Sequence, residues 1–162
     1  MTKDSLITAV LFDFGGVITA SPFEAFARYE LDLGLPPDSI RKINSTNPND
    51  NAWAKMERSE VDLAEFCQLF EAEAKSMGLE LSGEKVLVCL SGDVRPQMVR
   101  ALEILKERLP IGCITNNMKS GHGSGMSRTE DQATIIAEIM DMFEVVIESA
   151  KVGIRKPDPR IY

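Results

Sequence analysis

The first stretch of the chain joins an apolar run to a carboxylate and two glycines. Residues Ile7 to Phe12 form the run, Asp13 follows it directly, and Gly15 and Gly16 come just beyond. A short apolar run that ends at a turn signal is typical of a strand buried on both faces. Glycine lets the backbone turn sharply or approach a ligand closely. The pattern predicts a carboxylate at the carboxyl end of a strand, where open α/β sheets bind ligands; a plain polar strand end is the alternative.

Residues 20 to about 90 carry the signals of helices. Ser21, Pro22 and Glu24 fit an N-cap, a first helical position and a capping box, and Gly34 ends that helix. A second capping box at residues 62–65 opens a helix whose apolar spacing continues to residue 78. Helices inserted directly after the first strand would lie over the carboxyl end of the sheet. They are expected to form a lid or substrate-selecting cap; a helical layer packed on the core is the alternative.

The rest of the chain alternates helices with short apolar runs. A helix from Pro96 precedes the run 111–114, which ends at Thr115 and Asn116. A helix with Thr129 as its N-cap precedes the run 143–147. Because strand–helix–strand crossovers are right-handed, this order predicts a parallel sheet with Thr115 beside Asp13. The expected fold class is α/β, with a Rossmann-like sheet.

Composition and charge narrow the classes of function. The chain has 162 residues, 44% of them hydrophobic and 27% charged, as in a soluble globular domain. Its net charge of −7 disfavours a nucleic-acid or anionic-membrane partner, yet a few local cations can still bind a phosphorylated small molecule. No apolar run approaches the ~18 residues of a membrane span. The first residues lack the features of a secretory signal, so we expect a cytoplasmic protein.

The cysteines and the sole histidine form no metal or catalytic pattern. Cys67, Cys89 and Cys113 lie in apolar surroundings without metal-like spacing and are expected to be buried free thiols in a reducing compartment. His122 lies in the segment 119–129, which is rich in glycine and serine. That segment has neither the Gly-Lys-Ser/Thr element of a phosphate loop nor a dinucleotide fingerprint. We expect it to be a flexible surface loop.

Three kinds of polar group are expected at one edge of the sheet. They are the carboxylate of Asp13, the hydroxyl and amide of Thr115 and Asn116, and the amine of Lys156, which stands before a proline. A carboxylate can attack an electrophile and form a covalent intermediate. A hydroxyl, backbone N–H groups and a lysine can bind oxyanions and offset charge in the transition state. This combination predicts phosphoryl or acyl-type substitution.

The order of these motifs resembles that of the haloacid dehalogenase (HAD) superfamily. Residues 12–17, FDFGGV, resemble its first motif, residues 114–117, ITNN, its second, and residues 153–162, GIRKPDPRIY, its third. The last motif is similar to that of the N-terminal phosphatase domain of soluble epoxide hydrolases and of the phosphatase-like front domain of some acyl-CoA dehydrogenases. The resemblance implies a three-layer HAD-like core over residues 1–19 and 93–162, with a helical cap over residues 20–92.

The resemblance also implies roles for the motif residues. Asp13 would be the nucleophile and a ligand of Mg²⁺, and the peptide oxygen of Gly15 would be a further metal ligand. Lys156 would act in catalysis beside Asp13. The transferring phosphoryl group of a small phosphorylated substrate would be bound by Thr115, Asn116 and Gly16. Mg²⁺ takes oxygen ligands and neutralises charge between nucleophile and phosphate.

One departure from the family pattern lies in the first motif. Most superfamily phosphatases carry a second aspartate two residues after the nucleophile, which protonates the leaving alcohol and then activates water. This chain has Gly15 there, as some relatives do. General acid–base help is typically worth ~10²–10⁴ in rate. Leaving-group protonation must therefore come from water or from another group.

A second departure concerns the fourth motif, an acidic strand and loop that supplies further metal carboxylates. It would follow residue 162, and neither Asp131 nor Asp158 is placed to replace it. We therefore expect an incomplete core, a C-terminally truncated phosphatase domain with weak or no activity of its own. The strand of residues 7–12 should then be an exposed apolar edge, a surface for self-association or a homodimer.

The leading expectation is a HAD-like phosphatase that acts through an aspartyl-phosphate on Asp13. Two alternatives remain open. One is 2-haloacid dehalogenation, which uses the same aspartate without Mg²⁺, although the third motif favours the phosphatase. The other is a non-catalytic interaction module, as Gly15 and the absent fourth motif suggest.

Overall fold

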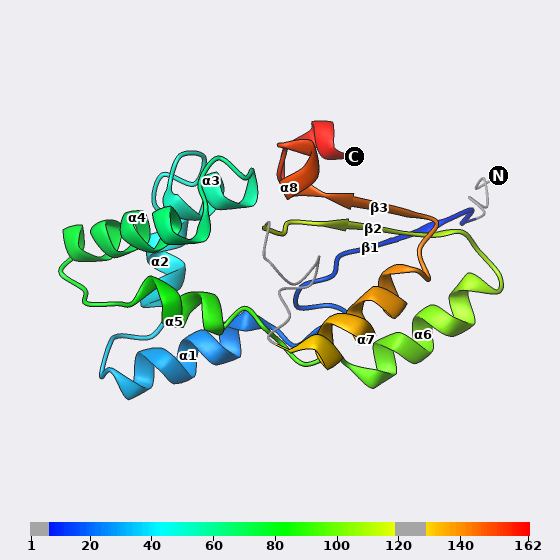
Figure 1. The fold of residues 1–162 in the computed structure, drawn as a ribbon, viewed down its shortest axis with the longest axis horizontal. Helices are drawn as coiled ribbons and strands as arrows, with labels where there is room; N and C mark the ends of the chain where they lie inside the picture. Colours follow the sequence, from blue (N-terminus) through cyan, green and yellow to red (C-terminus); the bar gives the residue numbers. More distant parts are fainter. Residues whose placement is uncertain (1–6, 119–128) are drawn as a thin grey trace, which may run out of the picture.

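The computed structural model describes residues 7–118 and 129–162. Within them, three parallel strands form a sheet in the order β1-β2-β3, with the bounds Val10–Phe12, Ile111–Thr115 and Val145–Glu148. Figure 1 shows α6 (Pro96–Lys106) and α7 (Glu130–Met140) along one face of this sheet. The predicted α/β class, with a parallel sheet and helices inserted after the first strand, is confirmed.

The central strand β2 is buried along its whole length. Cys113 pairs with Phe12 on one side and with Val146 on the other. A helix lies in each connection between neighbouring strands, α6 before β2 and α7 before β3, because parallel strands need a long crossover. The buried core between helices and sheet consists of Phe14, Ile18, Leu102, Ile111, Cys113, Ile136, Ile139 and Phe143.

The first strand is shorter and more exposed than the sequence predicts. It covers Val10–Phe12 rather than residues 7–12, and Ile7 is 72% exposed. Leu11 is 64% exposed, because successive side chains of a strand point to opposite faces and only one face meets α6 and α7. The prediction of a strand buried on both faces is therefore wrong. Among the described residues β1 pairs with β2 alone, so the expected exposed apolar edge is confirmed.

Helices form the insert between β1 and the rest of the sheet, called the helical insert below. They are α1 (Pro22–Asp32), α2 (Ser39–Ser45), α3 (Ala52–Glu57), α4 (Leu63–Ser76) and α5 (Gly83–Val88). Figure 1 places them beyond the arrowheads of β2 and β3, at the carboxyl ends of the strands. This is the position that the sequence predicts for a cap. The division into separate domains at residues 19/20 and 92/93 stays a prediction.

The helices of the insert begin at the capping residues that the sequence indicates. The Ser21 hydroxyl accepts from the Phe23 N–H at the start of α1. Asp62 and Glu65 make a reciprocal capping box at the start of α4. These side chains satisfy N–H groups that have no partner inside their helix. Helix α5 was not predicted individually, and Ser82 caps it in the same way.

Glutamates join the helices of the insert to one another. Buried Glu30 of α1 accepts from the N–H groups of Asp38 and Ile40, at 2.9 and 2.8 Å, where α2 begins. Glu73 and Glu71 of α4 accept in the same way from the first N–H groups of α3 and α5. Each of these carboxylates satisfies a helix end from a different part of the chain. The insert is therefore held together by polar contacts as well as by its apolar core.

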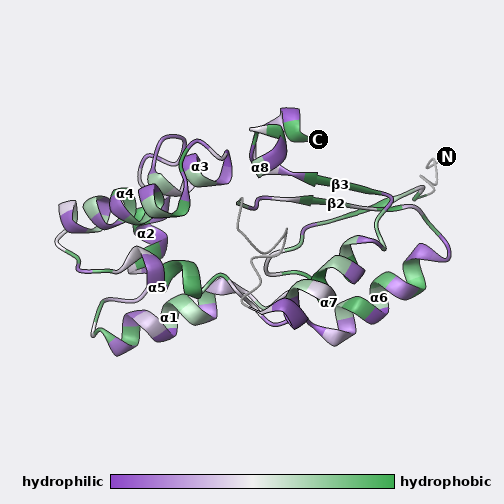
Figure 2. Ribbon diagram, viewed as in Figure 1, coloured by the Kyte–Doolittle hydropathy of each residue, from purple (hydrophilic) through white to green (hydrophobic). Residues whose placement is uncertain are grey.

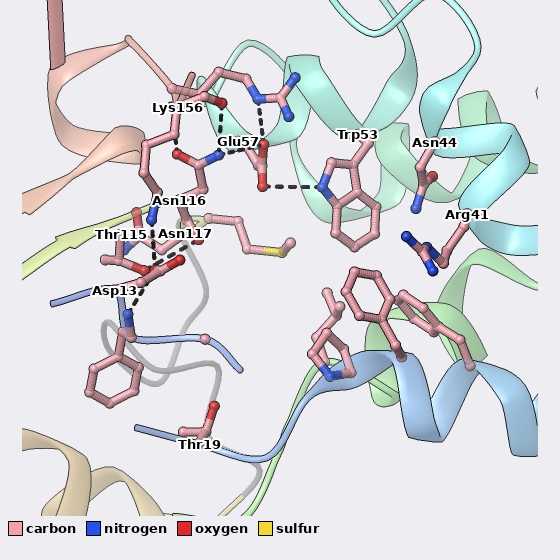
Figure 3. A pocket seen from close by; sticks show the side chains of 18 of the residues that line it. Asp13, Thr19, Arg41, Asn44, Trp53, Glu57, Thr115, Asn116, Asn117 and Lys156 are labelled. Carbon is pink, nitrogen blue, oxygen red and sulfur yellow. Dashed lines mark hydrogen bonds and ion pairs between the residues drawn. The ribbon is translucent and has the colours of Figure 1, made fainter. Parts of the chain in front are cut away.

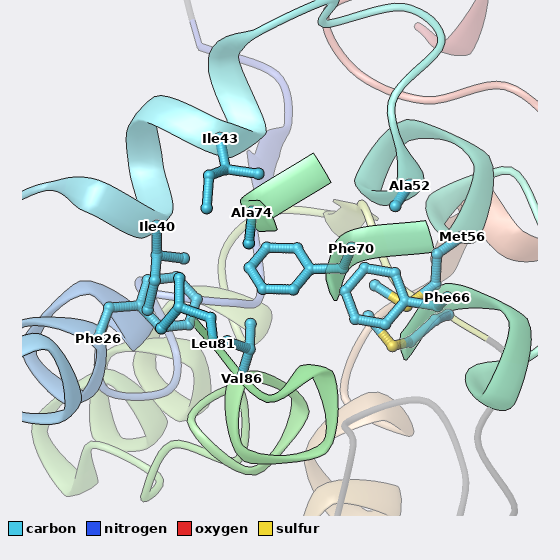
Figure 4. Close-up of a cluster of buried hydrophobic side chains, with 11 residues drawn as sticks. Phe26, Ile40, Ile43, Ala52, Met56, Phe66, Phe70, Ala74, Leu81 and Val86 are labelled. Carbon is cyan, nitrogen blue, oxygen red and sulfur yellow. The ribbon is translucent and has the colours of Figure 1, made fainter. Parts of the chain in front are cut away.

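An aromatic cluster fills the middle of the insert (Figure 4). Phe66 and Phe70 are stacked with ring centroids 5.6 Å apart. Trp53 contacts Phe66 and Phe26 edge to face. The buried members are Phe26, Ile40, Ile43, Ala52, Met56, Phe66, Phe70, Ala74, Leu81, Val86 and Met118. Met118 follows β2, so one residue of the sheet region packs into the insert.

The two chain segments that connect the insert to the sheet lie beside each other. Thr19 forms an antiparallel bridge with Val94, and the Ala20 N–H donates to the Asp93 carbonyl at 2.8 Å. A Cβ at Gly92 would lie only 2.5 Å from the Ala20 carbonyl oxygen, so this crossing requires glycine. The insert thus leaves and rejoins the sheet at one paired crossing.

The hydropathy of the elements matches their packing. Figure 2 shows hydrophobic residues along β2 and β3 and mixed hydrophobic and hydrophilic faces on the helices. Across residues 7–118 and 129–162, no helix is long and apolar enough to cross a membrane. The three cysteines are free, as expected, but only Cys113 is buried, whereas Cys67 and Cys89 are half-buried. His122 and the predicted surface loop, up to residue 128, lie outside the described residues.

Candidate active site

The predicted motif residues meet at the carboxyl edge of the sheet. Asp13 directly follows β1, and Thr115 ends the neighbouring strand β2. Lys156 comes from the segment between α8 (Ser149–Val152) and the short 3₁₀ helix η1 (Pro159–Ile161). Figure 3 shows Asp13, Thr115, Asn116 and Lys156 as one group. The parallel sheet therefore brings together residues that are far apart in the sequence.

Asp13 is held by one carboxylate oxygen. Its Oδ1 accepts from the Phe14 N–H at 2.7 Å and lies 2.7 Å from Lys156 Nζ. Within the described part of the chain Oδ2 has no hydrogen-bond partner, and 43% of the side chain is exposed. One oxygen thus fixes the orientation of the carboxylate, and the other is available to a reactant.

Lys156 is held both by its amine and by its backbone. The amine donates to the Ile114 carbonyl at 2.8 Å and pairs with Asp13. The Lys156 N–H donates to Asn116 Oδ1 at 2.8 Å, and Asn116 Nδ2 donates back to the Lys156 carbonyl at 3.2 Å. The Asn116 amide therefore positions the loop that carries the lysine. Its predicted contact with a phosphoryl group stays a prediction.

The residue after Asn116 joins the ends of β2 and β3. Asn117 Nδ2 donates to Glu148 Oε1 at 2.6 Å, and its Oδ1 accepts from the Ala150 N–H at 3.2 Å. The Asn117 N–H donates to Ser149 Oγ at 3.0 Å. Asn117, Glu148 and Ser149 are buried, and buried polar groups of this kind need such partners. The network gives the edge under the candidate site a defined shape.

A buried ion pair connects the helical insert to this edge. Glu57 of α3 lies 2.5 Å from Arg155 Nε and accepts from Asn116 Nδ2 at 3.3 Å. Trp53 Nε1 also donates to Glu57, at 3.1 Å, and Arg155 donates to the Pro48 carbonyl at 2.8 Å. Burial raises the pKa of Glu57 above its ordinary value, although the charge of Arg155 acts in the opposite direction. Insert and edge thus meet through a carboxylate whose ionised form is disfavoured.

A cavity of about 420 Å³ lies between this edge and the insert (Figure 3). Its volume is within the range of small-molecule sites, about 300–1,000 Å³. Asp13, Gly15, Thr115, Asn116 and Lys156 all contribute to its lining. The predicted catalytic edge therefore faces a space that a small molecule can fill.

The two glycines of the first motif have different surroundings. Gly15 lines the cavity, and a Cβ at this position would have no atom within 4 Å. Gly16 has φ 77°, in the left-handed region that favours glycine, and its N–H donates to Thr19 Oγ1 at 3.4 Å. Gly16 thus shapes the turn after β1 and lies outside the described lining of the cavity. Its predicted phosphoryl binding stays a prediction.

Five residues of the cavity lining were not among the predicted site residues: Arg41, Asn44, Trp53, Glu57 and Arg155. Arg155 precedes Lys156 in the third motif, and this adjacency was a usable signal. Arg41 and Asn44 carry no such signal, because helical periodicity does not show which polar residue of a helix faces a site. Only the docking of the insert on the sheet edge reveals them.

The predicted magnesium site is incomplete in the described residues. They contain no group of three or more His, Cys, Asp or Glu side chains that could hold a metal ion. Asp13 supplies one carboxylate, already in contact with Lys156 through Oδ1, and Gly15 supplies a peptide carbonyl. Mg²⁺ demands a nearly octahedral set of oxygen ligands. Asp13 and Gly15 alone therefore do not make a magnesium site.

The sheet edge, its aspartate and lysine and the overlying helices define a HAD-like hydrolase. A family model described as haloacid dehalogenase-like hydrolase matches residues 7–162. The chain belongs to this family, and the resemblance seen in its motifs is confirmed.

Curated relatives extend the comparison. Acyl-CoA dehydrogenase family member 10 of Mus musculus is 26% identical over 160 residues, which cover 95% of this chain and 14% of the relative. Bifunctional epoxide hydrolase 2 of Sus scrofa is 26% identical over 168 residues, which cover 96% of this chain and 30% of the relative. The chain thus spans less than a third of the length of either relative.

Solved structures share the fold. A HAD family enzyme from Bacteroides thetaiotaomicron, in complex with magnesium and inorganic phosphate, aligns with a TM-score of 0.56 at 18% identity over 96% of this chain and 75% of that one. The HAD-hydrolase YfnB from Bacillus subtilis, bound to magnesium, has a TM-score of 0.53 at 20% identity over 95% and 70% of the two chains. A dehalogenase has a TM-score of 0.57 at 19% identity over 98% and 69%. At these identities the likeness establishes the fold alone.

Proposed function

We propose that the protein hydrolyses a small phosphate monoester through an aspartyl-phosphate on Asp13. The observation that carries this proposal is the Asp13–Lys156 pair, 2.7 Å long, which faces a cavity at the carboxyl edge of the sheet. In the first step Asp13 Oδ2 forms a bond to phosphorus while the bond from phosphorus to the leaving oxygen breaks. Lys156 and the Thr115 hydroxyl stabilise the charge on the phosphoryl oxygens.

The leaving alcohol and the second step involve water. Because Gly15 carries no acid, the departing alkoxide takes its proton from water. A water molecule then attacks phosphorus, which releases inorganic phosphate and restores the Asp13 carboxylate. Asn116 keeps Lys156 in place through its two contacts with the lysine backbone.

Trapping the covalent intermediate tests this proposal even where turnover is slow. The protein is incubated with p-nitrophenyl phosphate and quenched in acid, and the peptide that contains Asp13 is analysed by mass spectrometry. We expect the addition of one phosphoryl group in the wild type and in Asp141→Asn, an exposed carboxylate on the far helix α7, but none in Asp13→Asn. No addition in the wild type, or equal addition in Asp13→Asn, would overturn the proposal.

Restoring an acid at position 15 tests the role given to Gly15. The open space around this residue and its ordinary backbone conformation admit an aspartate. We expect Gly15→Asp to accelerate hydrolysis of an alkyl phosphate, a poor leaving group, by up to ~10²-fold or more. The isosteric Gly15→Asn should not. Equal rates in both variants would contradict the idea that an acid is what this site lacks.

Carbon–halogen hydrolysis is a second candidate, and Gly15 favours it because a departing halide needs no proton. Asp13 Oδ2 would attack the carbon of a 2-haloacid, the carbon–halogen bond would break, and water would release the hydroxy acid. Halide release from 2-chloropropionate, measured beside phosphate release, distinguishes the two activities. A non-catalytic module would show neither activity and no Mg²⁺ binding by calorimetry that depends on Asp13.

A further inference from the structure

The cavity beside Asp13 has two ends of different chemistry. Asp13, Thr115 and Lys156 lie at one end, and residues of the helical insert line the other (Figure 3). The apolar part of that lining consists of Pro22, Phe23, Phe26, Trp53, Leu90 and Met118. A phosphoryl group at Asp13 would therefore leave its organic part among aromatic and aliphatic side chains.

The central aromatic ring of this lining is fixed and presents apolar atoms. Trp53 contacts Phe26 and Phe66 edge to face, with centroids 6.3 and 6.0 Å apart. Its indole N–H already donates to Glu57 Oε1 at 3.1 Å. The ring thus has no free donor for a ligand, and a group that packs against it gains by being apolar.

Two polar side chains of α2 lie at the end of the cavity away from Asp13. Figure 3 shows Arg41 and Asn44 on the opposite side from Asp13. Asn44 Oδ1 is buried and has no hydrogen-bond partner among the described residues, so a donor from a ligand would satisfy it. The guanidinium of Arg41 lies 4.7 Å from the centroid of the Phe23 ring and carries donors only.

We propose that the organic part of the substrate is a compact, apolar group of aromatic size that ends in a polar group able to donate and accept hydrogen bonds, such as a carboxamide. The apolar part packs against Trp53 and Phe26, the donor reaches Asn44, and the acceptor reaches Arg41. This specificity rests on the proposed phosphate site at Asp13 and adds the leaving group to it. A volume of about 420 Å³ suits a compact group rather than a long acyl chain.

Trp53 is the single tryptophan of the chain, so its fluorescence reports binding in the cavity. The probes are non-hydrolysable phosphonates: methylphosphonate, phenylphosphonate, and phenylphosphonates with a para methyl or para carboxamide group. Methylphosphonate is measured by competition with phenylphosphonate. We expect phenylphosphonate to bind roughly tenfold tighter than methylphosphonate, because its ring is buried. The carboxamide should bind about threefold to tenfold tighter than its methyl counterpart.

Variants separate the two ends of the cavity. Asn44→Leu and Arg41→Met should each remove the advantage of the carboxamide while keeping that of the phenyl ring. Lys42→Met, an exposed position of the same helix outside the lining, should keep both advantages. Lys156→Met should weaken the binding of every probe, because its amine holds the phosphonate in the proposed function.

The outcomes distinguish this inference from the function on which it rests. Equal affinity for methylphosphonate and phenylphosphonate, with both lost in Lys156→Met, overturns the substrate class and leaves the phosphate site intact. A carboxamide advantage that survives in Asn44→Leu and Arg41→Met overturns the contact at the far end. Failure of every probe to bind the wild type overturns the phosphate site itself.

Discussion

The helical insert and the sheet region use different means of holding their elements together. The insert surrounds an aromatic cluster, and glutamates from one helix satisfy the first N–H groups of another. The sheet region has a buried central strand, but Leu11 of its edge strand is 64% exposed. Its buried polar network lies at one place, the carboxyl edge, where Asn117 joins β2 to β3.

The difference separates stability from chemistry. The insert supplies a firm wall to the cavity, whereas the sheet edge supplies the reacting groups and their supporting hydrogen bonds. The two regions meet through Glu57 and Arg155 and through the paired crossing of residues 18–20 and 93–95. Changes inside the insert should therefore lower the stability of the wall, and changes at the meeting point should alter how the regions are coupled.

The largest expected effect is on the aromatic cluster. Phe66 is fully buried between Trp53 and Phe70, so Phe66→Ala should lower the free energy of unfolding by about 3–5 kcal/mol. Urea unfolding followed by Trp53 fluorescence measures this change directly in the insert. Leu69→Ala, at a 37% exposed position of the same helix, is the control. Similar losses in the two variants would show that the cluster does not support the insert.

Matched glycine substitutions compare the two regions next. A Cβ at Gly83 would lie 2.6 Å from the Cα of Cys67, whereas one at Gly112 in β2 would meet Leu11 Cδ2 at 2.8 Å. Backbone cannot move aside as the end of an exposed side chain can. We expect Gly83→Ala to lower the free energy of unfolding by about 1–3 kcal/mol. Gly112→Ala should stay within about 1 kcal/mol of the wild type. Thermal unfolding by circular dichroism checks the order, and the reverse order would contradict it.

The meeting point of the two regions should respond to pH. Because burial raises the pKa of Glu57 above 4.5, the folded protein keeps a proton at this site that the unfolded chain has lost. The free energy of unfolding of the wild type minus that of Glu57→Gln should therefore fall as the pH rises above 4.5, by at most about 1.4 kcal/mol per pH unit. Urea titrations between pH 4.5 and the folded-state pKa measure the difference. A difference that rises with pH would reverse the sign given to this pair.

The smallest expected effect on stability is at the open edge of the sheet. Leu11→Lys places a charge on the exposed strand and should reduce self-association through β1. It should change the free energy of unfolding by no more than about 0.5 kcal/mol. Sedimentation at increasing protein concentration measures the association. Leu31→Lys, at a 78% exposed position of α1, is the control, and an equal reduction there would dissociate the effect from the strand edge.

Local signals predicted individual elements well. The capping boxes and terminal glycines placed α1 and α4 because these signals act within a few residues. The strands were predicted less well: β1 is shorter than residues 7–12, and β3 covers Val145–Glu148 rather than residues 143–147. Strand length depends on the neighbours available for pairing, which lie far away in the sequence.

The motifs predicted one side of the candidate site. Asp13, Thr115, Asn116 and Lys156 were expected together, and the structure brings them together because parallel strands end at one edge. The partners of these residues were not predicted. That Asn116 binds the backbone of Lys156, and that Glu57 pairs with Arg155, follows from contacts between segments with no common sequence pattern.

The sequence by itself determined the α/β class, the helical character of the insert and the chemical type of the groups at the sheet edge. These properties follow from local periodicity, capping and the order of short motifs along the chain. Only the tertiary structure decided which residues of the insert face Asp13. Arg41, Asn44 and Trp53 line the cavity because of the way their helices pack on the aromatic cluster and dock through Glu57, and such packing depends on the shapes of side chains far apart in the chain.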